Sequence, residues 1–531
     1  MKSLARALGT ASVLIMAVLG AAAPSAAARP GPAASTHDGT VRGRTVKGVD
    51  EFLGIPYAAP PVGQLRWRPP QPVAPWPGAR PATKLPPACP QLKNSNGPRS
   101  TNENCLYLSV YRPRGTTTHA RLPVLFWIHG GGLTTGSGNQ HNGSLFVTTD
   151  HIMVVSINYR LGAFGFLALP SLSAEATDHA SGDYGLLDQE AALRWVHANI
   201  ARFGGNPRNV TIAGESAGGY SVCSLLSSPP MRGLFSHAVI QSGSCATETL
   251  AAAQKTGTAF ARAAGCRNAG TAATCLRRKS ANGLLDNRLY PSADIPTAGG
   301  RELPVASATV VARGAFTRVP LLIGTNHNEG RTFSEGYADD PESTYVKTID
   351  TDYGPEAPKV LAAYPWSSFP SPYTTAYALG AVWTDSAFFA GIGGCGTQNL
   401  AGQFAKRTPT FFYQFDDLHA PGLNTKFPGY QWGAGHAMEL AYMWPSFDNG
   451  TPLYPQLTPA QKQLSKEMVR YWGAFVRSGA PVVTGQTPWP RYQTSQVLSL
   501  QPGDATTPIT AAQFAGDHNC AFWDALPGQP G

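Results

Sequence analysis

The segment TIAGESAGGY, residues 211–220, holds a serine in the arrangement that a serine nucleophile requires. Ser216 stands between Gly214 and Gly218 in a G-x-S-x-G pattern. The chain has 57 glycines, so the pattern arises easily by chance and is weak by itself. Its meaning depends on the elements around it.

The residues on either side of Ser216 predict a strand followed at once by a helix. Residues 210–213 (VTIA) are apolar and β-branched, and residues 217–226 (AGGYSVCSLL) have the pattern of a helix. A serine at such a sharp turn projects its hydroxyl above the sheet, and small neighbours let the turn pack closely. The helix also points its positive N-terminal end at the place where an oxyanion would form.

A second glycine-rich segment offers the donors that such an oxyanion needs. His129, Gly130, Gly131 and Gly132 directly follow the apolar run 122–128 (LPVLFWI). Glycines there let backbone N–H groups face a ligand without a Cβ in the way, as in the HGGG type of oxyanion loop. A plain turn at the end of a strand is the competing interpretation, and the G-x-S-x-G segment downstream disfavours it.

A serine nucleophile also needs a base oriented by an acid, in the chain order serine, acid, histidine. Glu329 follows the apolar run 320–324, where the loop after a strand would carry the acid. His436 follows Gly433 and Gly435 and precedes an apolar helical stretch. Three competitors remain open, namely His419 and His518 as the base and Glu335 as the acid.

Alternating strand and helix patterns predict an α/β protein with a mostly parallel central sheet and helices on both faces. A pattern from residue 186 to 203 predicts a helix that ends at Gly204. Segments 246–318 and 331–408 are mixed and partly helical, and we interpret them as excursions over the sheet of a single domain, residues 29–531. The expected strands share nearly continuous apolarity, as strands covered on both faces should: 122–128, 152–157, 210–213, 238–241, 320–324 and 410–415.

The first 28 residues have the features of a secretory signal peptide. Lys2 and Arg6 form a positive start, an apolar stretch follows at residues 13–23, and Ala26 and Ala28 offer a cleavage site of the A-x-A type. The apolar stretch is too short to span a bilayer comfortably. We therefore expect a secreted protein without integral membrane association, cleaved near Ala28.

The charge and cysteine patterns disfavour two classes of function. The formal net charge is +9, but the basic residues are scattered, which disfavours nucleic-acid binding. Eight cysteines behind a signal peptide indicate disulfides, and no Cys/His cluster has the spacing of a zinc site. No metal and no other cofactor is expected. Spacing leaves the pairing open, although two pairs can close short loops: Cys89 with Cys105, and Cys266 with Cys275.

Several ordered motifs resemble those of one known family. The stretch FLGIPYA…LRW (52–67) resembles the family's opening signature, and ENCLYLSV (103–110) resembles EDCLYLNV with Asn104 in place of aspartate. Three more segments follow in family order: NYRLGAFGFL (158–167), GDYGLLDQ (182–189) and FGGNPRNVTIAGESAGG (203–219). From about residue 38 to 525 the sequence resembles a type-B carboxylesterase, and this implies the α/β-hydrolase fold.

The resemblance implies a Ser-Glu-His triad that hydrolyses carboxylic esters through an acyl-enzyme. Ser242 matches a hydroxyl that supports the acid, and Glu215, beside the nucleophile, is expected to support the site as well. Two structural ion pairs are implied, Arg66 with Glu103 and Arg160 with Asp188. The residues that match the family's reacting groups are the nucleophile Ser216, the acid Glu329, the base His436 and the oxyanion donors Gly131, Gly132 and Ala217.

The resemblance also bears on the cysteines. Cys223 and Cys245 have no counterpart in the family and flank the segments of the predicted site, so they are either buried thiols or an additional bridge. The implied disulfides are those of the cholinesterase branch: Cys89–Cys105, Cys266–Cys275 and Cys395–Cys520.

The expected partner is a small-molecule ester, of small to medium size, and a monomer is favoured. Cholinesterase relatives hold a quaternary ammonium with an aromatic residue between their first two cysteines. Residues 90–104 contain no aromatic residue here and add Lys93 and Arg99, so choline esters are disfavoured. A lipase or sterol esterase is the main alternative, and a non-catalytic adhesion protein is a remote one. A secreted peptidase on the same fold has no feature in its favour.

Overall fold

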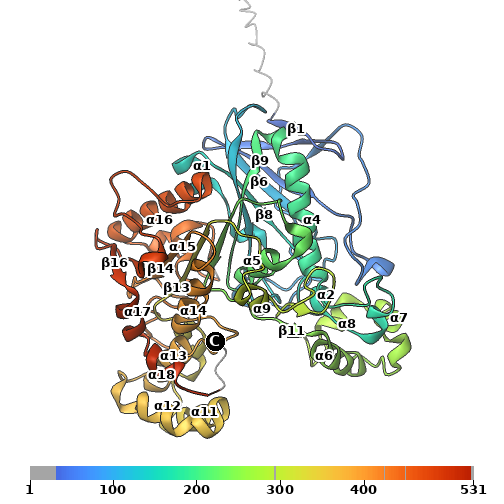
Figure 1. The fold of residues 1–531 in the computed structure, drawn as a ribbon. Coiled ribbons are helices and arrows are strands. Elements are labelled where there is room, and N and C mark those ends of the chain that lie inside the picture. Colours follow the sequence, from blue (N-terminus) through green and yellow to red (C-terminus); the bar gives the residue numbers. More distant parts are fainter. Residues whose placement is uncertain (1–30, 292–294, 424, 449, 528–531) are drawn as a thin grey trace, which may run out of the picture. The chain divides into compact units, whose positions relative to one another are not determined.

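The computed structural model describes residues 31–291, 295–423, 425–448 and 450–527. The expected signal peptide, residues 1–28, lies outside the described residues. From Pro32 onward, the described residues form one compact unit. A sheet runs through the centre of this unit with helices around it (Figure 1).

The central sheet of the described residues has 11 strands. In spatial order they are β16 (Thr507–Thr510), β15 (Gln496–Leu500), β14 (Thr410–Phe415), β13 (Leu321–Asn326), β10 (His237–Gln241), β9 (Gly205–Glu215), β7 (Leu122–Ile128), β8 (Met153–Ile157), β6 (Tyr107–Pro113), β4 (Val49–Pro56) and β3 (Arg44–Val46). Neighbours from β15 to β8 pair in parallel, whereas the pairs at both edges are antiparallel. The predicted α/β class with a mostly parallel sheet is therefore confirmed.

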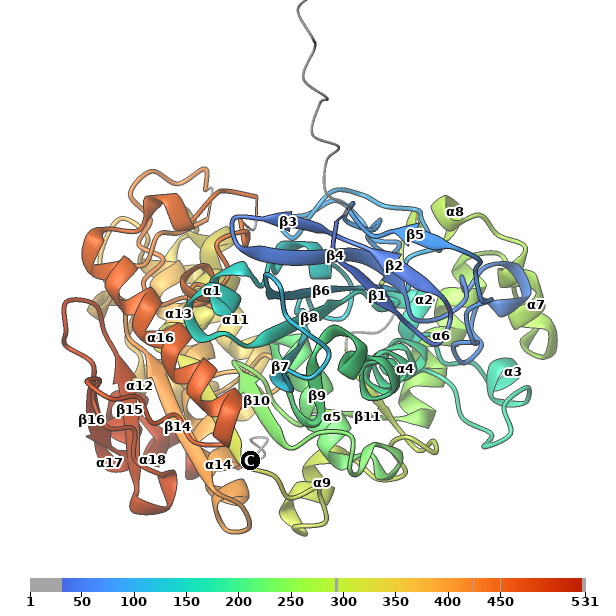
Figure 2. The same cartoon turned by 90° about the horizontal axis from the view of Figure 1, so that it is seen from above.

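Helices cover both faces of the sheet because the side chains of each central strand alternate between two apolar cores. In β7, Val124, Phe126 and Ile128 enter one core, and Leu125 and Trp127 enter the other. The first core is covered by α4 (Tyr184–Asn199), α5 (Ala217–Ser227) and α14 (Gly394–Ala405), and the second by α1 (Ser144–Asp150), α15 (Leu440–Met443) and α16 (Pro459–Ser478). Figure 2 shows α4 and α16 on opposite sides of the strands.

The six strands expected from sequence all form, with shifts of a few residues at their ends. The largest shift is in β9, which begins at Gly205 rather than Val210 because it already pairs with Leu122 of β7 there. The expected helix is α4, continued by a 3-10 turn to Phe203, and it ends at Gly204 with φ +88°. The edge strands β3, β4 and β6 were not expected, since charged residues interrupt them.

Those charged residues are paired across the strands, and all of them except Arg44 are buried. Arg112 of β6 lies 3.5 Å from Asp50 of β4, and both side chains are buried. Glu51, in β4, pairs with Arg44 of β3 at 2.8 Å. Buried charges are tolerated only with a partner. Because such residues interrupt the apolar run by which a buried strand is recognised, these strands could not be predicted from the sequence.

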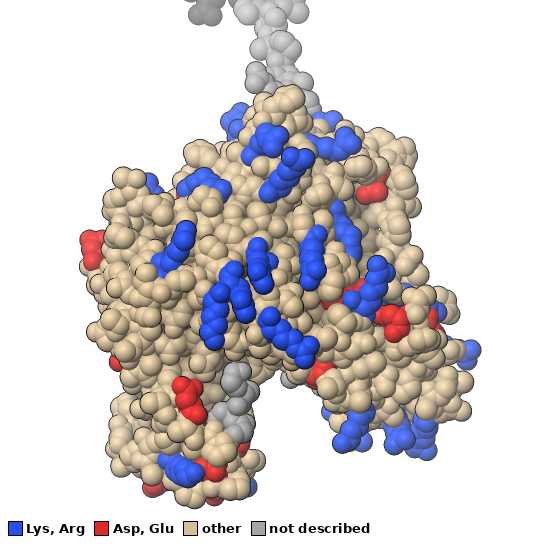
Figure 3. All heavy atoms as spheres, in the orientation of Figure 1, with Lys and Arg blue, Asp and Glu red and all other residues tan. Residues whose placement is uncertain are grey.

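Two helical lobes are inserted between strands, at the segments expected to be excursions. The first contains α6 (Leu250–Ala263), α7 (Ala272–Arg277), α8 (Ala281–Leu285) and α9 (Ser307–Ala312), and the second contains α10 (Gly330–Ser334), α11 (Glu342–Tyr353), α12 (Ala357–Ala363) and α13 (Thr374–Asp385). Part of each lobe has an apolar core of its own. Both lobes extend beyond the carboxyl ends of the parallel strands, and Figure 3 shows a hollow between them.

The other described elements are short. They are β1 (Ala33–Ser35), β2 (Thr40–Arg42) and β5 (Ala79–Pro81), which form a small sheet; the pair β11 (Glu248–Thr249) and β12 (Thr297–Ala298); and the helices α2 (Gly162–Phe166), α3 (Pro170–Ser173), α17 (Ala511–Asp517) and α18 (Cys520–Asp524). Within the described ranges, no helix is both long enough and apolar enough to cross a bilayer. Lys and Arg outnumber Asp and Glu on the face drawn in Figure 3 and spread over it.

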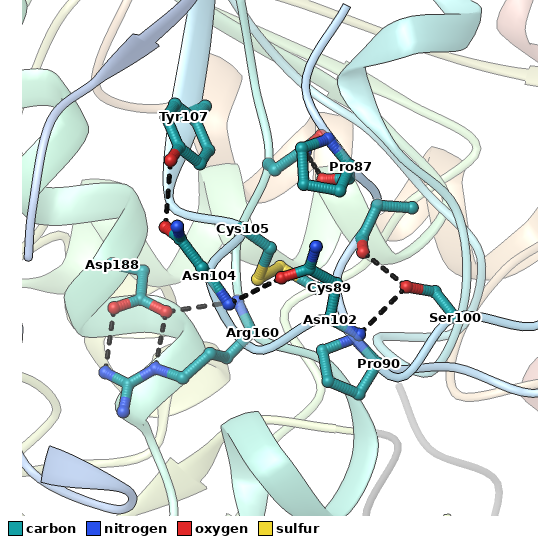
Figure 4. The surroundings of a disulfide bond; sticks show 12 residues. Pro87, Cys89, Pro90, Ser100, Asn102, Asn104, Cys105, Tyr107, Arg160 and Asp188 are labelled. Atoms are coloured by element: carbon teal, nitrogen blue, oxygen red, sulfur yellow. Dashed lines mark hydrogen bonds and ion pairs between the residues drawn. A yellow bond between two sulfur atoms is a disulfide. The ribbon is translucent and has the colours of Figure 1, made fainter. Parts of the chain in front are cut away.

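All eight cysteines are joined in disulfides: Cys89–Cys105, Cys223–Cys245, Cys266–Cys275 and Cys395–Cys520. The second bridge resolves the open alternative for Cys223 and Cys245, and it ties α5 to the segment after β10. Near the first bridge, Asn104 accepts a hydrogen bond from the Tyr107 hydroxyl at 2.9 Å, and the ion pair of Arg160 with Asp188 lies beside it (Figure 4).

Both structural ion pairs implied by the family resemblance form. Arg160 and Asp188 make two hydrogen bonds of 2.7 and 2.8 Å, and both side chains are almost fully buried. Arg66 Nε donates to Glu103 at 2.7 Å. A bidentate arginine–carboxylate pair fixes geometry as well as charge. These pairs therefore hold the loops at the carboxyl ends of the strands rather than take part in chemistry.

Removal of the Cys223–Cys245 bridge tests its contribution to stability. The bridge spans 22 residues, so the double variant Cys223→Ala/Cys245→Ala should lose about 3 kcal/mol of unfolding free energy. Urea unfolding monitored by tryptophan fluorescence measures this. Before the variant is made, thiol titration of the denatured parent should find no free thiol. One or two titratable thiols per chain would contradict full pairing.

Candidate active site

Ser216 occupies a sharp turn between a strand and a helix. Strand β9 ends at Glu215, helix α5 begins at Ala217, and Ser216 between them has φ +56° and ψ −124°. Positive φ at a residue with a Cβ costs energy and persists only where the surroundings fix it. Here the backbone N–H of Ser216 donates to Gln241 O of β10 at 2.9 Å, which anchors the turn to the neighbouring strand.

The glycines beside Ser216 are required by close backbone contact. A Cβ at Gly218 would lie 2.1 Å from Ile128 O, and a Cβ at Gly214 would lie 2.4 Å from Gly218 O. Contacts this short with backbone cannot relax without moving a strand or the helix. The G-x-S-x-G pattern is thus explained by packing of α5 against the end of β7, as well as by the turn itself.

The glycine loop after β7 lies next to Ser216. Gly131 and Gly132 have φ of +100° and +61°, and a Cβ at Gly131 would meet Thr135 O at 2.4 Å. Gly131 O accepts a hydrogen bond from Thr135 Oγ1 at 3.1 Å, and His129 O accepts one from the Tyr159 hydroxyl at 2.7 Å. Within the described residues, no hydrogen bond uses the N–H groups of Gly131, Gly132 or Ala217. These donors are therefore available to a ligand.

Glu329 and His436 form a short, buried pair. His436 Nδ1 lies 2.6 Å from Glu329 Oε2, and the other carboxylate oxygen accepts hydrogen bonds from Thr325 Oγ1 at 2.9 Å and from Asn326 N at 2.8 Å. Burial acts to raise the pKa of Glu329, but His436 and these hydrogen bonds lower it below its ordinary value. Glu329 is therefore held as an anion that orients the imidazole.

The second nitrogen of His436 faces Glu215. His436 Nε2 lies 3.3 Å from Glu215 Oε1. Burial alone would lower the pKa of His436, but the carboxylates of Glu215 and Glu329 raise it to about 9. Burial raises the pKa of Glu215 well above its usual range, against the opposing effect of His436. Among the described residues no hydrogen bond links Ser216 Oγ to Nε2, a contact that often tightens only when substrate binds.

A third buried carboxylate, Glu439, belongs to the same group and was given no role from the sequence. Glu439 accepts hydrogen bonds from Asn326 Nδ2 at 2.7 Å and from Gln241 Nε2 at 3.2 Å. Gln241 Oε1 in turn accepts from Trp472 Nε1 at 3.0 Å. Burial raises the pKa of Glu439 to about 7, although the hydrogen bond from Asn326 opposes this. The available signal was its position three residues after His436.

Ser216, His436 and the glycine loop line one cavity of about 770 Å³. The segment 94–96, from the loop closed by the first disulfide, adds a polar wall, and Asn96 Nδ2 donates to Thr135 Oγ1 at 3.1 Å. Among the described lining residues no side chain is Lys or Arg. The aromatic part of the wall comes from Tyr220, Phe333, Phe388, Phe389, Trp432 and Phe447.

The competing candidates lie elsewhere or have other partners. His518 is buried between Asp385 and Gln414, at 2.7 and 2.8 Å, outside this cavity. His419 does not line the cavity either. Glu335 does line it, but its carboxylate accepts a hydrogen bond from Thr425, not from a histidine.

Ser242, expected to support the acid, is fully buried after β10. Its hydroxyl is among the groups that lower the pKa of Glu329. It makes no hydrogen bond of good geometry with the described residues. The described ranges contain no group of three or more acidic, His or Cys side chains arranged to hold a metal ion.

Comparison with known proteins agrees with this geometry. A model of the carboxylesterase family matches residues 30–523. Cocaine esterase of Homo sapiens is 34% identical to the chain, over 93% of the chain and 92% of that protein. Para-nitrobenzyl esterase of Bacillus subtilis (strain 168) is 35% identical, over 88% and 94%. A solved structure of a thermophilic PNB esterase superposes with a TM-score of 0.76 at 31% identity, covering 92% of this chain and 99% of that one.

The match extends over almost the whole chain in sequence and in fold. The structural neighbours share the α/β-hydrolase fold that the sequence resemblance implied. The chain therefore belongs to the carboxylesterase family, and it is a serine carboxylesterase that hydrolyses carboxylic esters.

Proposed function

We propose that Ser216, His436 and Glu329 form the catalytic triad of this esterase. The observation that carries the proposal is the 2.6 Å pair of His436 Nδ1 with Glu329 Oε2 at a cavity that Ser216 also lines. A carboxylate bound to Nδ1 fixes the imidazole tautomer and leaves Nε2 for the substrate side. Among the described histidines that competed for the role, His436 alone combines an acid partner with a place in this cavity.

In the proposed acylation step, His436 takes the proton of Ser216 Oγ as this oxygen attacks the ester carbonyl. The negative charge that develops on the carbonyl oxygen meets the free N–H groups of Gly131, Gly132 and Ala217. Loss of one such donor typically costs about 3–4 kcal/mol of transition-state stabilisation. The imidazolium then gives its proton to the leaving alcohol, and the acyl group remains on Ser216.

Deacylation follows the same steps, with water in place of the serine hydroxyl as the attacking group. His436 removes a proton from the water that attacks the acyl-enzyme, and the carboxylic acid leaves as Ser216 regains its proton. Glu215 and Glu439 take no part in bond making in this proposal. They set the electrostatic field in which His436 changes its charge, because all three carboxylates of the group are buried.

For the substrate we propose small to medium carboxylic esters. A cavity of about 770 Å³ with an aromatic wall and a polar wall accommodates an ester of that size. Residues 90–104 supply Asn94, Ser95 and Asn96 to the cavity and no aromatic ring, which supports the exclusion of choline esters. Lys93 and Arg99 add nothing to it, because neither is among the described lining residues and Arg99 is paired with Asp286 at 2.8 Å.

We also propose that the protein is secreted as a monomer of one catalytic domain, residues 29–531, after cleavage near Ala28. The four disulfides support an oxidising destination. The scattered basic residues give no support to nucleic-acid binding. N-terminal sequencing of protein recovered from culture medium tests the cleavage site, and light scattering tests the monomer.

Ser216→Ala should abolish esterase activity without unfolding the protein. Loss of a triad nucleophile typically lowers kcat by about a million-fold. Ser224→Ala is the matched control, since Ser224 is a buried serine of the same helix whose hydroxyl has no partner among the described residues. Diisopropyl fluorophosphate should label the parent and Ser224→Ala, but not Ser216→Ala. Activity of Ser216→Ala above about 1% of the parent would refute the assignment.

Glu215→Gln should shift the acid limb of the pH profile of kcat/KM to lower pH. The base form of His436 is required, so kcat/KM rises as pH passes through the pKa of His436, which is about 9. Removal of the Glu215 carboxylate removes a negative charge that raises this pKa, so the neutral imidazole persists to lower pH. Glu335→Gln, on the same cavity wall, is the control and should leave the limb in place. If the acid limb of Glu215→Gln lies at the same pH as that of the parent, the electrostatic coupling between Glu215 and His436 is contradicted.

Para-nitrophenyl esters of increasing acyl length test the proposed substrate class. We expect kcat/KM to peak at short or medium chains and to fall for palmitate, because one cavity must hold the whole acyl group. The measurement is made below the solubility limit of each ester. A strong rise in rate above that limit for long chains would favour the lipase alternative instead.

A further inference from the structure

A second cavity lies on the other side of the segment that carries Glu329. It has a volume of about 460 Å³, within the range of small-molecule sites. Its wall combines His327, Asn328 and Arg331 with residues 370–373, Tyr377 of α13 and the segments around Leu418 and Gln431. The active-site cavity and this cavity share no lining residue among those described.

The charged group of this cavity is Arg331, in the turn that follows Glu329. Its guanidinium stands over the ring of Tyr377 at 5.0 Å, and Nη1 donates to Gln431 O at 3.2 Å. None of the ion pairs formed by the described residues includes Arg331. Burial lowers its pKa, but a guanidinium still carries its charge at neutral pH. The cavity thus contains a cation without a counter-ion.

The acidic residues at the end of β14 are engaged by other groups, and Asp517 lines a neighbouring cavity that also contains Arg331. No Asp or Glu is among its described lining residues. Asp416 is bound to His327 Nδ1 at 2.7 Å, and Asp417 accepts a hydrogen bond from Gln461 at 2.8 Å. An anion that entered the cavity would therefore meet Arg331 and no carboxylate of the cavity's own described lining.

One side of the wall, away from His327, Asn328, His419 and Gln431, is largely apolar or aromatic. Tyr373 and Tyr377 present rings, Pro370 and Pro372 add aliphatic surface, and Leu418 lies at the mouth with 47% of its surface exposed. A guanidinium binds a carboxylate through two parallel hydrogen bonds, whereas such a wall gives an alkyl or aryl group a place out of water. The two halves fit one kind of molecule, a carboxylate with an apolar body.

We propose that this cavity is a binding site for small amphiphilic carboxylates, the class of acid that ester hydrolysis releases. The carboxylate pairs with Arg331, and its apolar body lies against Tyr373, Tyr377 and Leu418. The site is separate from the reacting groups, so its occupancy does not depend on which residue acts as the nucleophile.

Residues that are adjacent in sequence line different cavities. Arg331 lines the second cavity, whereas Thr332 and Phe333 line the first. Likewise, Gln431 lines the second cavity and Trp432 lines the first. The Tyr377 hydroxyl accepts a hydrogen bond from Gln431 N at 2.8 Å, so a ligand packed on Tyr377 contacts the residue before Trp432. A carboxylate bound in the second cavity should therefore change KM for the ester, with little effect on the free energy of unfolding.

The binding test uses protein whose Ser216 has been blocked with diisopropyl fluorophosphate, so that the reacting end of the first cavity is occupied. Calorimetric titration with octanoate should show binding, and octan-1-ol and octylammonium should bind at least about tenfold more weakly, because they cannot pair with Arg331. Failure of the label to attach would count against the triad only. Binding is then measured on unlabelled protein with the variants described next.

Leu418→Asp and Leu418→Asn are the matched variants. Both replace an exposed leucine, so both should fold, but only the aspartate places a negative charge at the mouth of the cavity. Leu418→Asp should weaken octanoate binding at least about tenfold relative to Leu418→Asn. Arg331→Gln should abolish it. Equal octanoate affinity in the two Leu418 variants, or equal affinity of the parent for octanoate and octan-1-ol, would overturn the proposal.

Discussion

The positive-φ turn at Ser216 is the constraint on which the rest of the site depends. A residue held in such a conformation costs about 1–3 kcal/mol and needs surroundings that over-determine it. Three contacts do so here: the hydrogen bond from Ser216 N to Gln241 O, the contact of Gly218 with Ile128 O, and the disulfide between α5 and the segment after β10. Two of them tie the turn to β10 and the segment after it, and one ties it to the end of β7, so the parallel strands on both sides of β9 fix the turn.

The second constraint is charge, because three carboxylates are buried around one imidazole. Isolated, each would take up a proton, since burial raises the pKa of a carboxyl. Glu329 remains an anion because it accepts hydrogen bonds from Thr325 and Asn326 and faces His436. The side-chain amide of Asn326 also donates to Glu439, so one asparagine holds two of the three carboxylates, through its backbone N–H and its side chain. The pKa of the base therefore belongs to the group rather than to His436 alone.

The parts of this structure that the sequence predicted are those with local signals. The central strands are apolar on both faces, and the helix after Ser216 follows its strand directly. Ser216 and Glu329 come just after strands β9 and β13, and His436 follows two glycines before an apolar stretch. The roles of Gln241 and Trp472 had no local signal, since the hydrogen bonds that define them join residues more than 100 positions apart. Glu439 had only its position close to His436 in sequence as a signal, since its hydrogen bonds come from Asn326 and Gln241. The charges in β4 and β6 hid those strands because a charged residue interrupts the apolar pattern even where it is paired in the fold.

The geometry of the segment after Glu329 explains why two cavities lie on either side of it. The second lobe begins immediately after Glu329, so α10 (Gly330–Ser334) is a single turn of helix between the sheet and the lobe. Successive side chains of a helix point about 100° apart, so residues 331 and 333 of one turn face opposite sides. A lobe inserted at this position therefore creates a wall whose two surfaces belong to different sites. A ligand in the second cavity therefore contacts Arg331, two residues after the Glu329 that orients His436 in the active site.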